Sequence, residues 1–314
     1  MALKQVVEIC DFLEKPRMDV SALKDMFIQN GLDASEFDTR KVRGDKGKTQ
    51  FVKILIKGKE RKSKKNGIPT LGIIGRLGGI GARPHKIGLV SDADGAITAL
   101  ASALKITKMR AQGDALNGNV IVATHLSPRS PIIPHDPVPF MGAPVSMETM
   151  NRYEVDQDMD AILSIDTTKG NRIINHRGFA ISPTVKDGYI LRVSEDLLDI
   201  MQMVTGKLPV VFPITTQDIT PYGNGVYHLN SIMQPAVATH APVVGVAITT
   251  EVAVPGCATG ASHPLDIEMA CRFCIEVAKV FGERKYSFYD EQEFKRLVML
   301  YGSLEHLKIL KKKR

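Results

Sequence analysis

Short apolar runs that alternate with helical patterns are the feature that most constrains the fold of this chain. The runs are TLGII at 70–74, VIVAT at 120–124, DAILSI at 160–165 and VVGVAI at 243–248. Such runs are typical of strands that helices cover on both faces. We therefore predict an α/β fold with three αβα layers around a mostly parallel central sheet.

Other segments complete the predicted order. We expect helices over 1–30, 95–109 and 264–281, strands over 50–56, 87–91 and 210–214, and a helix that Ser194 caps. Asp19 or Ser21 is the expected cap of a second helix near the N-terminus. The predicted division is an N-terminal part at 1–67 with helices, a strand and a basic loop, an α/β core at 68–282, and a C-terminal helix with a basic end at 283–314.

Metal-capable residues follow several of the predicted strands. Asp92 lies in an acidic turn, SDADG, that also contains Asp94 and opens an Ala-rich helix. His125 follows VIVAT, Asp166 follows ILSI, and His263 stands in the loop after VVGVAI. Ligands of open α/β sheets bind beyond the carboxyl ends of the strands. Carboxylates and imidazoles suit zinc or a similar divalent ion, so we expect Asp92, His125, Asp166 and His263 to converge as metal ligands.

Charge and composition argue against several classes of function. The net charge is +7, and Lys57–Lys65 and Leu310–Arg314 carry much of the excess. Aromatic residues make up only 6% of the chain and do not interleave these basic runs, so nucleic acid is not expected as a partner. We see no apolar run long enough to span a membrane and no signal peptide, and we expect a cytoplasmic protein.

Three segments resemble motifs of the dinuclear zinc exopeptidases. SDADGAITALASAL is similar to their metal-bridging aspartate turn, and AILSIDTT resembles a later strand that ends in a metal-binding acid. VVGVAITTEVAVPGCATGASHPLDIE resembles their last strand, loop and metal-binding histidine. The resemblance covers about 68–282 and is strongest to the glutamyl and deblocking aminopeptidase branch. The whole chain is similar to an uncharacterised bacterial and archaeal family related to that clan.

The chain departs from the clan at two motifs. Arg76-Leu77-Gly78 stands where the resemblance implies His-x-Asp, and no pair of glutamates lies near His125. The resemblance then implies one divalent metal, with zinc expected first and manganese or cobalt as alternatives, and an arginine in place of the other metal. Without the glutamate base, Asp94, His135 or the metal alone would activate water.

Polar loops supply the expected substrate contacts. Arg76, Asp218, Asn224 and His228 are the predicted set, of which the last three lie in TTQDITPYGNGVYHLN. Hydrogen bonds that form the turn are the alternative role for the loop residues. Lys169, in TTKGNRIINHRG, is a further side chain that can bind a carboxylate or phosphate.

These observations favour a metal-dependent hydrolase of a small peptide or amide, with metal-bound water as the nucleophile. The alternative is a degenerate relative that binds a small molecule, such as an amino-acid derivative, or serves as an assembly subunit. A minor alternative is an amino-acid racemase, because LGIIGRLGGIG resembles the opening glycine turn of such enzymes, with Cys257 as an acid–base residue. We expect a homo-oligomer, for which the proline-rich loop at 131–144 offers a contact.

Overall fold

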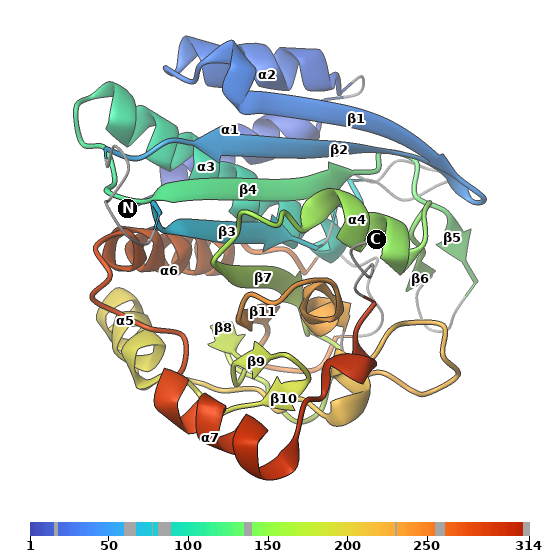
Figure 1. Cartoon of the computed structure of the whole chain (residues 1–314). Helices are drawn as coiled ribbons and strands as arrows, with labels where there is room; N and C mark the ends of the chain where they lie inside the picture. Colours follow the sequence, from blue (N-terminus) through green and yellow to red (C-terminus); the bar gives the residue numbers. More distant parts are fainter. Residues whose placement is uncertain are drawn as a thin grey trace.

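The chain has a mixed α/β fold, which a computed structural model reveals. The described residues are 1–15, 18–59, 67–76, 78–80, 89–134, 140–229, 231–254 and 261–309. Within this part of the chain, nine strands form one sheet and two short strands form a separate hairpin. Helices flank the large sheet, so the predicted α/β class is confirmed (Figure 1).

The large sheet is parallel at its centre and antiparallel at its margins. Its strands are β1 (Phe37–Gly44), β2 (Gly47–Ile56), β3 (Thr70–Gly75), β4 (Asn119–Leu126), β7 (Ala161–Thr167), β8 (Gly178–Ile181), β9 (Val185–Lys186), β10 (Tyr189–Ile190) and β11 (Val243–Thr249). They lie in the order β1-β2-β4-β3-β7-β11-β9-β10, with β8 also beside β11. β4, β3, β7 and β11 are parallel neighbours. β1 and β2 are antiparallel because a turn of only two residues joins them.

The helices were mostly predicted by their patterns. They are α1 (Leu3–Leu13), α2 (Val20–Gln29), α3 (Asp94–Ala111), α4 (Met147–Glu154), α5 (Glu195–Thr205), α6 (Pro264–Gly282) and α7 (Glu291–Tyr301). Short 3-10 helices are η1 (Ala34–Glu36), η2 (Ser91–Ala93), η3 (Thr216–Ile219), η4 (Ser231–Ala238) and η5 (Glu305–Leu307). Asp19 caps α2 and Ser194 caps α5, as expected. The sequence patterns did not predict α4.

Two predicted strands are wrong. Leu89 and Val90 are irregular and lead into η2, while 87 and 88 lie outside the described residues. A backbone hydrogen bond links this segment to Gly79, whose amide donates to the carbonyl of Asp92 at 3.0 Å. The segment 210–214 makes only a single bridge, from Val211 to Ile181, because Pro213 has no amide to continue a ladder.

Two layers of helices enclose the sheet. α1, α3 and α6 pack together on one face, whereas α4 and η4 contact the other face (Figure 1). Successive side chains of β7 point to opposite faces of the sheet. Leu163 and Ile165 join the core under α3 and α6, whereas Ile162 joins the core under η4. The small hairpin of β5 (Ile132–Ile133) and β6 (Phe140–Met141) stands apart from the large sheet. Because β1 and β2 belong to the large sheet, the parts at 1–67 and 68–282 share one sheet.

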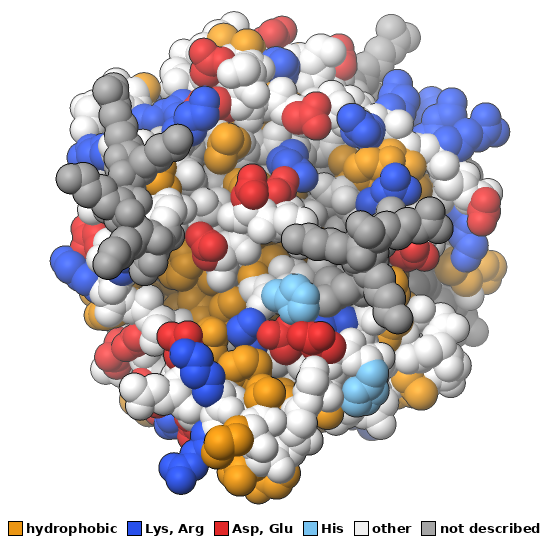
Figure 2. Space-filling model, viewed as in Figure 1, with side chains coloured by type: hydrophobic (Ala, Val, Ile, Leu, Met, Phe, Trp, Pro, Cys, Tyr) orange, Lys and Arg blue, Asp and Glu red, His pale blue; other side chains and the backbone are white. Residues whose placement is uncertain are grey.

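Basic side chains gather over the β1–β2 hairpin, toward the upper right in Figure 2. The exposed basic residues of this hairpin are Arg40, Lys41, Arg43, Lys46 and Lys48. Acidic and basic side chains are scattered among apolar and uncharged ones over the rest of the face that Figure 2 shows. Among the described helices, none combines the length and the apolar character that a membrane span requires.

Candidate functional site

The residues that follow the central strands meet at one edge of the sheet. In the parallel register Gly75 of β3 lies opposite Thr124 of β4 and Ile165 of β7. The residue that follows each of these positions is Arg76 directly after β3, His125 on β4 and Asp166 on β7. These three residues therefore lie level with one another on neighbouring strands. The amide of Arg76 continues the pairing by donating to the carbonyl of Ile165 at 2.8 Å. Level residues of parallel strands share a face, and here it is the face that α4 and η4 cover.

A fully buried glutamate joins two of these side chains. Glu154 is the last residue of α4, and its Oε1 lies 2.5 Å from Nδ1 of His125. Its other oxygen, Oε2, accepts a hydrogen bond from Nη1 of Arg76. Nη2 of Arg76 contacts the sulfur of Met147, in the first turn of the same helix. The short helix α4 thus holds both the imidazole and the guanidinium in place.

The orientation of His125 follows from this contact. A carboxylate only accepts hydrogen bonds, so Nδ1 carries the proton and donates to Glu154. Nε2 then has a free lone pair, and no described residue hydrogen-bonds to it. The ring of Phe51 on β2 packs 6.0 Å from the imidazole, and Gly78 leaves no room for a Cβ against the carbonyl oxygen of His125.

Asp166 is a buried acid beside this pair. Its Oδ1 accepts from the amide of Thr167 at 2.7 Å, and its Oδ2 accepts from the hydroxyl of Ser231 at 2.9 Å. Burial raises the pKa of Asp166 to about 6, although these hydrogen bonds and the nearby charges of Arg76 and His125 favour the carboxylate. The charge of Arg76 therefore acts on one of the acids that we expected to hold a metal.

A second buried charge cluster lies at the start of α3 and α6. Asp94 is fully buried, and its two oxygens accept hydrogen bonds from Nζ of Lys169 and from the hydroxyl of Ser262. Nζ of Lys169 also donates to the carbonyl of Ala261. Burial raises the pKa of Asp94, although Lys169 and Ser262 favour its charged form. The predicted catalytic residue Asp94 is thus paired with a lysine of the same chain.

The remaining predicted metal ligands are His263, at the start of α6, and Asp92, in the short helix that precedes α3. His263 is the exposed N-cap residue of α6, and its charge acts on Asp94 and on Asp266 in the first turn of that helix. Asp92 is buried in η2, with its Cβ beside Gly79. His135, the other predicted catalytic residue, lies outside the described residues, and so does Cys257.

The four predicted ligands do not form the expected metal centre. No three of Asp92, His125, Asp166 and His263, all of which are described, place ligand atoms within 4.8 Å of one another. The guanidinium of Arg76 binds Glu154, and its charge favours the carboxylate of Asp166. The arrangement of these four residues therefore does not fit a divalent ion held as the resemblance implies.

A different trio of potential ligands lies near the C-terminus. Among the described residues, Asp187, His240 and Glu305 do bring ligand atoms within 4.8 Å of one another. Asp187, however, already accepts hydrogen bonds from the ammonium groups of Lys186 and Lys308. Two fixed positive charges on the central carboxylate oppose a cation there. This trio fastens the C-terminal segment to the sheet.

The predicted substrate contacts in the 215–229 loop form hydrogen bonds within the loop. Asp218 is buried and accepts from the amide of Thr215 at 2.8 Å, which caps η3. Asn224 bonds the side chain of Thr220 and the amide of Val226. His228 stacks on Tyr222 with ring centroids 4.3 Å apart. These bonds are the turn-forming role that the sequence left open, and contact with a substrate stays a prediction.

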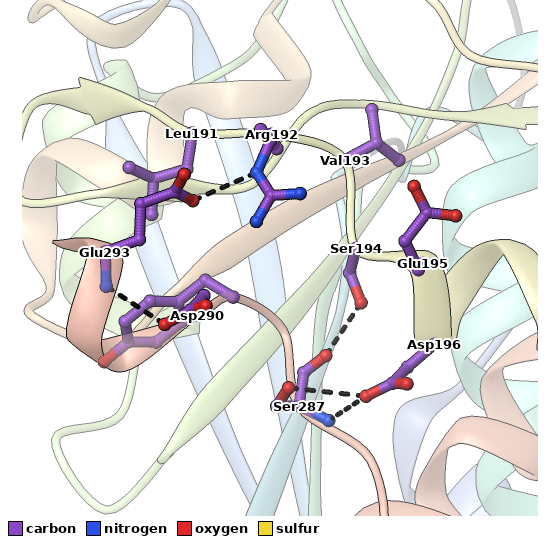
Figure 3. Close-up of a pocket in the computed structure, with 10 residues that line it drawn as sticks. Leu191, Arg192, Val193, Ser194, Glu195, Asp196, Ser287, Asp290 and Glu293 are labelled. Atoms are coloured by element: carbon purple, nitrogen blue, oxygen red, sulfur yellow. Dashed lines mark hydrogen bonds and ion pairs between the residues drawn. The ribbon is translucent and has the colours of Figure 1, made fainter.

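A pocket of about 250 Å³ lies between the start of α5 and the start of α7 (Figure 3). Its polar groups hold the two helices together: Ser194 donates to the carbonyl of Ser287 at 2.7 Å, and Asp196 accepts from the amide of Ser287. Arg192 pairs with Glu293 at 3.0 Å across the pocket. These contacts account for the polar lining, so we assign no chemistry to this pocket.

The comparison with known families supports only part of the resemblance. The family model described as a protein of unknown function, DUF1177, matches residues 40–311. The chain belongs to the DUF1177 family. No curated protein matches the chain. The expected membership of an uncharacterised family is therefore confirmed, while no comparison links DUF1177 to the zinc exopeptidases.

Proposed function

We propose that the chain is a hydrolase of a small peptide or amide in which His125 activates the attacking water. The observation that carries the proposal is the 2.5 Å contact between Nδ1 of His125 and Oε1 of Glu154. It leaves Nε2 without a described partner at the carboxyl edge of a parallel sheet, where ligands of such folds bind. The substrate class comes from the resemblance of the sequence motifs.

The chemistry needs a base, an acid and a hydrogen-bond donor. Nε2 of His125 takes a proton from water, and the hydroxide adds to the carbonyl carbon. The same proton then passes from His125 to the nitrogen of the leaving amine as the C–N bond breaks, which gives a carboxylic acid and an amine. Glu154 keeps the imidazole oriented and stabilises its charged form. Nε of Arg76 is buried without an acceptor among the described residues, so it offers a hydrogen bond to the carbonyl oxygen.

The test is hydrolysis of a panel of dipeptides and N-acyl amino acids by the wild type and two variants. His125→Gln and Glu154→Gln should each lower kcat/KM by about 100-fold or more, since general acid–base catalysis supplies a factor of that order. The pH profile of Glu154→Gln should also shift, because its imidazole loses the charged partner. His306→Gln is the matched control, since His306 is exposed on η5 and should leave the rate unchanged.

Binding without hydrolysis is the second candidate. His125 is only 4% exposed, and both Glu154 and Asp94 already have cationic partners in the chain. This internal pairing favours a site that encloses a ligand and leaves it intact. A wild type that cleaves no member of the panel would overturn the hydrolase and favour this candidate. Turnover that survives in His125→Gln would instead overturn the role of His125 as the base.

A further inference from the structure

A pocket of about 390 Å³ beside the start of α6 has no role in the proposed hydrolysis. The lining residues that matter for its chemistry are Arg177, Glu251, Val252, Val254, His263 and Asp266. None of them belongs to the His125–Glu154 pair. The volume lies within the usual range of small-molecule pockets, which is roughly 300–1,000 Å³.

One wall of this pocket carries a buried acceptor without a donor. Asp266 is 2% exposed, and its Oδ1 has no hydrogen-bond partner among the described residues. The nearest cation is Nε of Arg177, which lies 3.7 Å away and is too distant for a hydrogen bond. Buried polar atoms are usually paired, because a buried carboxylate oxygen without a donor costs stability.

The neighbouring lysine does not fill this gap. Nζ of Lys169 is bonded to Asp94 and to the carbonyl of Ala261. The chain therefore satisfies one buried acid, Asp94, but leaves Oδ1 of Asp266, which lines the pocket, without a donor among the described residues. Burial accordingly raises the pKa of Asp266, although His263 and Arg177 favour the carboxylate. A ligand that brings its own donor would remove the cost.

The rim of the pocket indicates the rest of the ligand. The side chain of Arg177 is 56% exposed, and His263 is exposed as well, so both can meet an anionic group. Glu251 adds a second acid, and Val252 and Val254 provide apolar surface. We propose that this pocket binds a small zwitterion with an apolar side chain, with its ammonium on Asp266 and its carboxylate on Arg177. An apolar amino acid, free or at the end of a short peptide, has this chemistry.

Calorimetric titration of the whole chain with three related compounds tests the proposal. We expect saturable binding of L-leucine, and affinities at least about tenfold weaker for leucinamide, which lacks the carboxylate, and for 4-methylpentanoate, which lacks the ammonium. Equal affinities for all three compounds, or no binding of leucine at millimolar concentrations, would overturn it. The result does not depend on hydrolysis, because leucine should bind His125→Gln as tightly as the wild type.

Two variants separate recognition from a structural role. Asp266→Asn should weaken leucine binding at least about tenfold while the denaturation midpoint stays the same or rises, because the variant removes a buried charge whose Oδ1 accepts no hydrogen bond from the described residues. Arg177→Gln should weaken leucine but leave leucinamide unchanged. Arg296→Gln, an exposed change on α7, is the control. Full leucine affinity in both Asp266→Asn and Arg177→Gln would contradict the assignment.

Discussion

At the residue scale, Glu154 organises the candidate site. It is the only described acid bonded to both Arg76 and His125, and it is fully buried. An isolated buried carboxylate would be expensive, but each of its oxygens has a cationic or polar partner. Removal of either Arg76 or Glu154 leaves the other charge buried without its partner. The resulting loss of stability exceeds the net contribution of the intact ion pair. The pair is therefore best probed by deleting one member at a time.

Arg76→Met should destabilise the protein by about 3–5 kcal/mol, the usual cost of breaking a buried ion pair. The cause is the carboxylate of Glu154, which would keep only His125 as a partner. Urea denaturation at neutral pH measures the change, with the exposed Arg296→Met as the control. A loss below about 1 kcal/mol would mean that Glu154 is solvated or neutral without Arg76.

The sequence predicted part of this cluster. Arg76, His125 and Asp166 each follow an apolar run, and parallel strands end at one edge, so their common location could be predicted. Glu154 could not be found by the same logic, because it comes from a helix and not from a strand end. Its only local signal is Ser146, which caps the short helix that Glu154 ends. Which cation pairs with which acid depends on packing that no local pattern encodes.

At the scale of elements, short contacts fix how helices and strands meet. A Cβ on Gly75 would overlap the carbonyl of Gly95, so α3 approaches the end of β3 closely. The four central parallel strands and the helices α3 and α6 were predicted from the periodicity of the sequence. The missed strand β1 (Phe37–Gly44) has an exposed, charged pattern and pairs only with β2, so burial gave no signal for it. The wrong strand at 210–214 shows that an apolar run alone does not secure a ladder.

The C-terminal segment is fastened to the sheet through Asp187. Burial raises the pKa of Asp187, but hydrogen bonds from Lys186, Lys308 and His240 outweigh it and hold the pKa at about 2. Because the folded pKa lies below the ordinary value of 3.8, these contacts stabilise the protein above about pH 4 and are lost as the pH falls toward 2. Their contribution is about 2 kcal/mol.

Asp187→Asn should therefore lower the free energy of unfolding by about 2 kcal/mol at pH 7 and by much less near pH 2. Urea denaturation over this pH range measures the difference between the two proteins. Asp199→Asn, on α5, is the control. A difference that does not change with pH would show that Asp187 is held by something other than its charge.

At the scale of the whole molecule, the carboxyl edge of the sheet has two charged clusters on opposite faces. Arg76, His125 and Glu154 lie under α4, whereas Asp94 and Lys169 lie at the start of α3 and α6. The sequence placed Asp94, His125 and Asp166 at this edge and predicted a metal there. It could not show that Lys169 pairs with Asp94 and that Arg76 pairs with Glu154, because the partners in each pair are far apart in sequence. The family match over 40–311 includes both clusters.

The central claim is that His125, Glu154 and the chain's own cations perform the reaction at this edge. The most direct measurement is the rate of dipeptide hydrolysis after exhaustive treatment with a chelator, together with elemental analysis of the same sample. We predict an unchanged rate and a content of zinc, manganese and cobalt far below one ion per chain. Loss of the rate on chelation and its recovery with one equivalent of zinc would contradict the account.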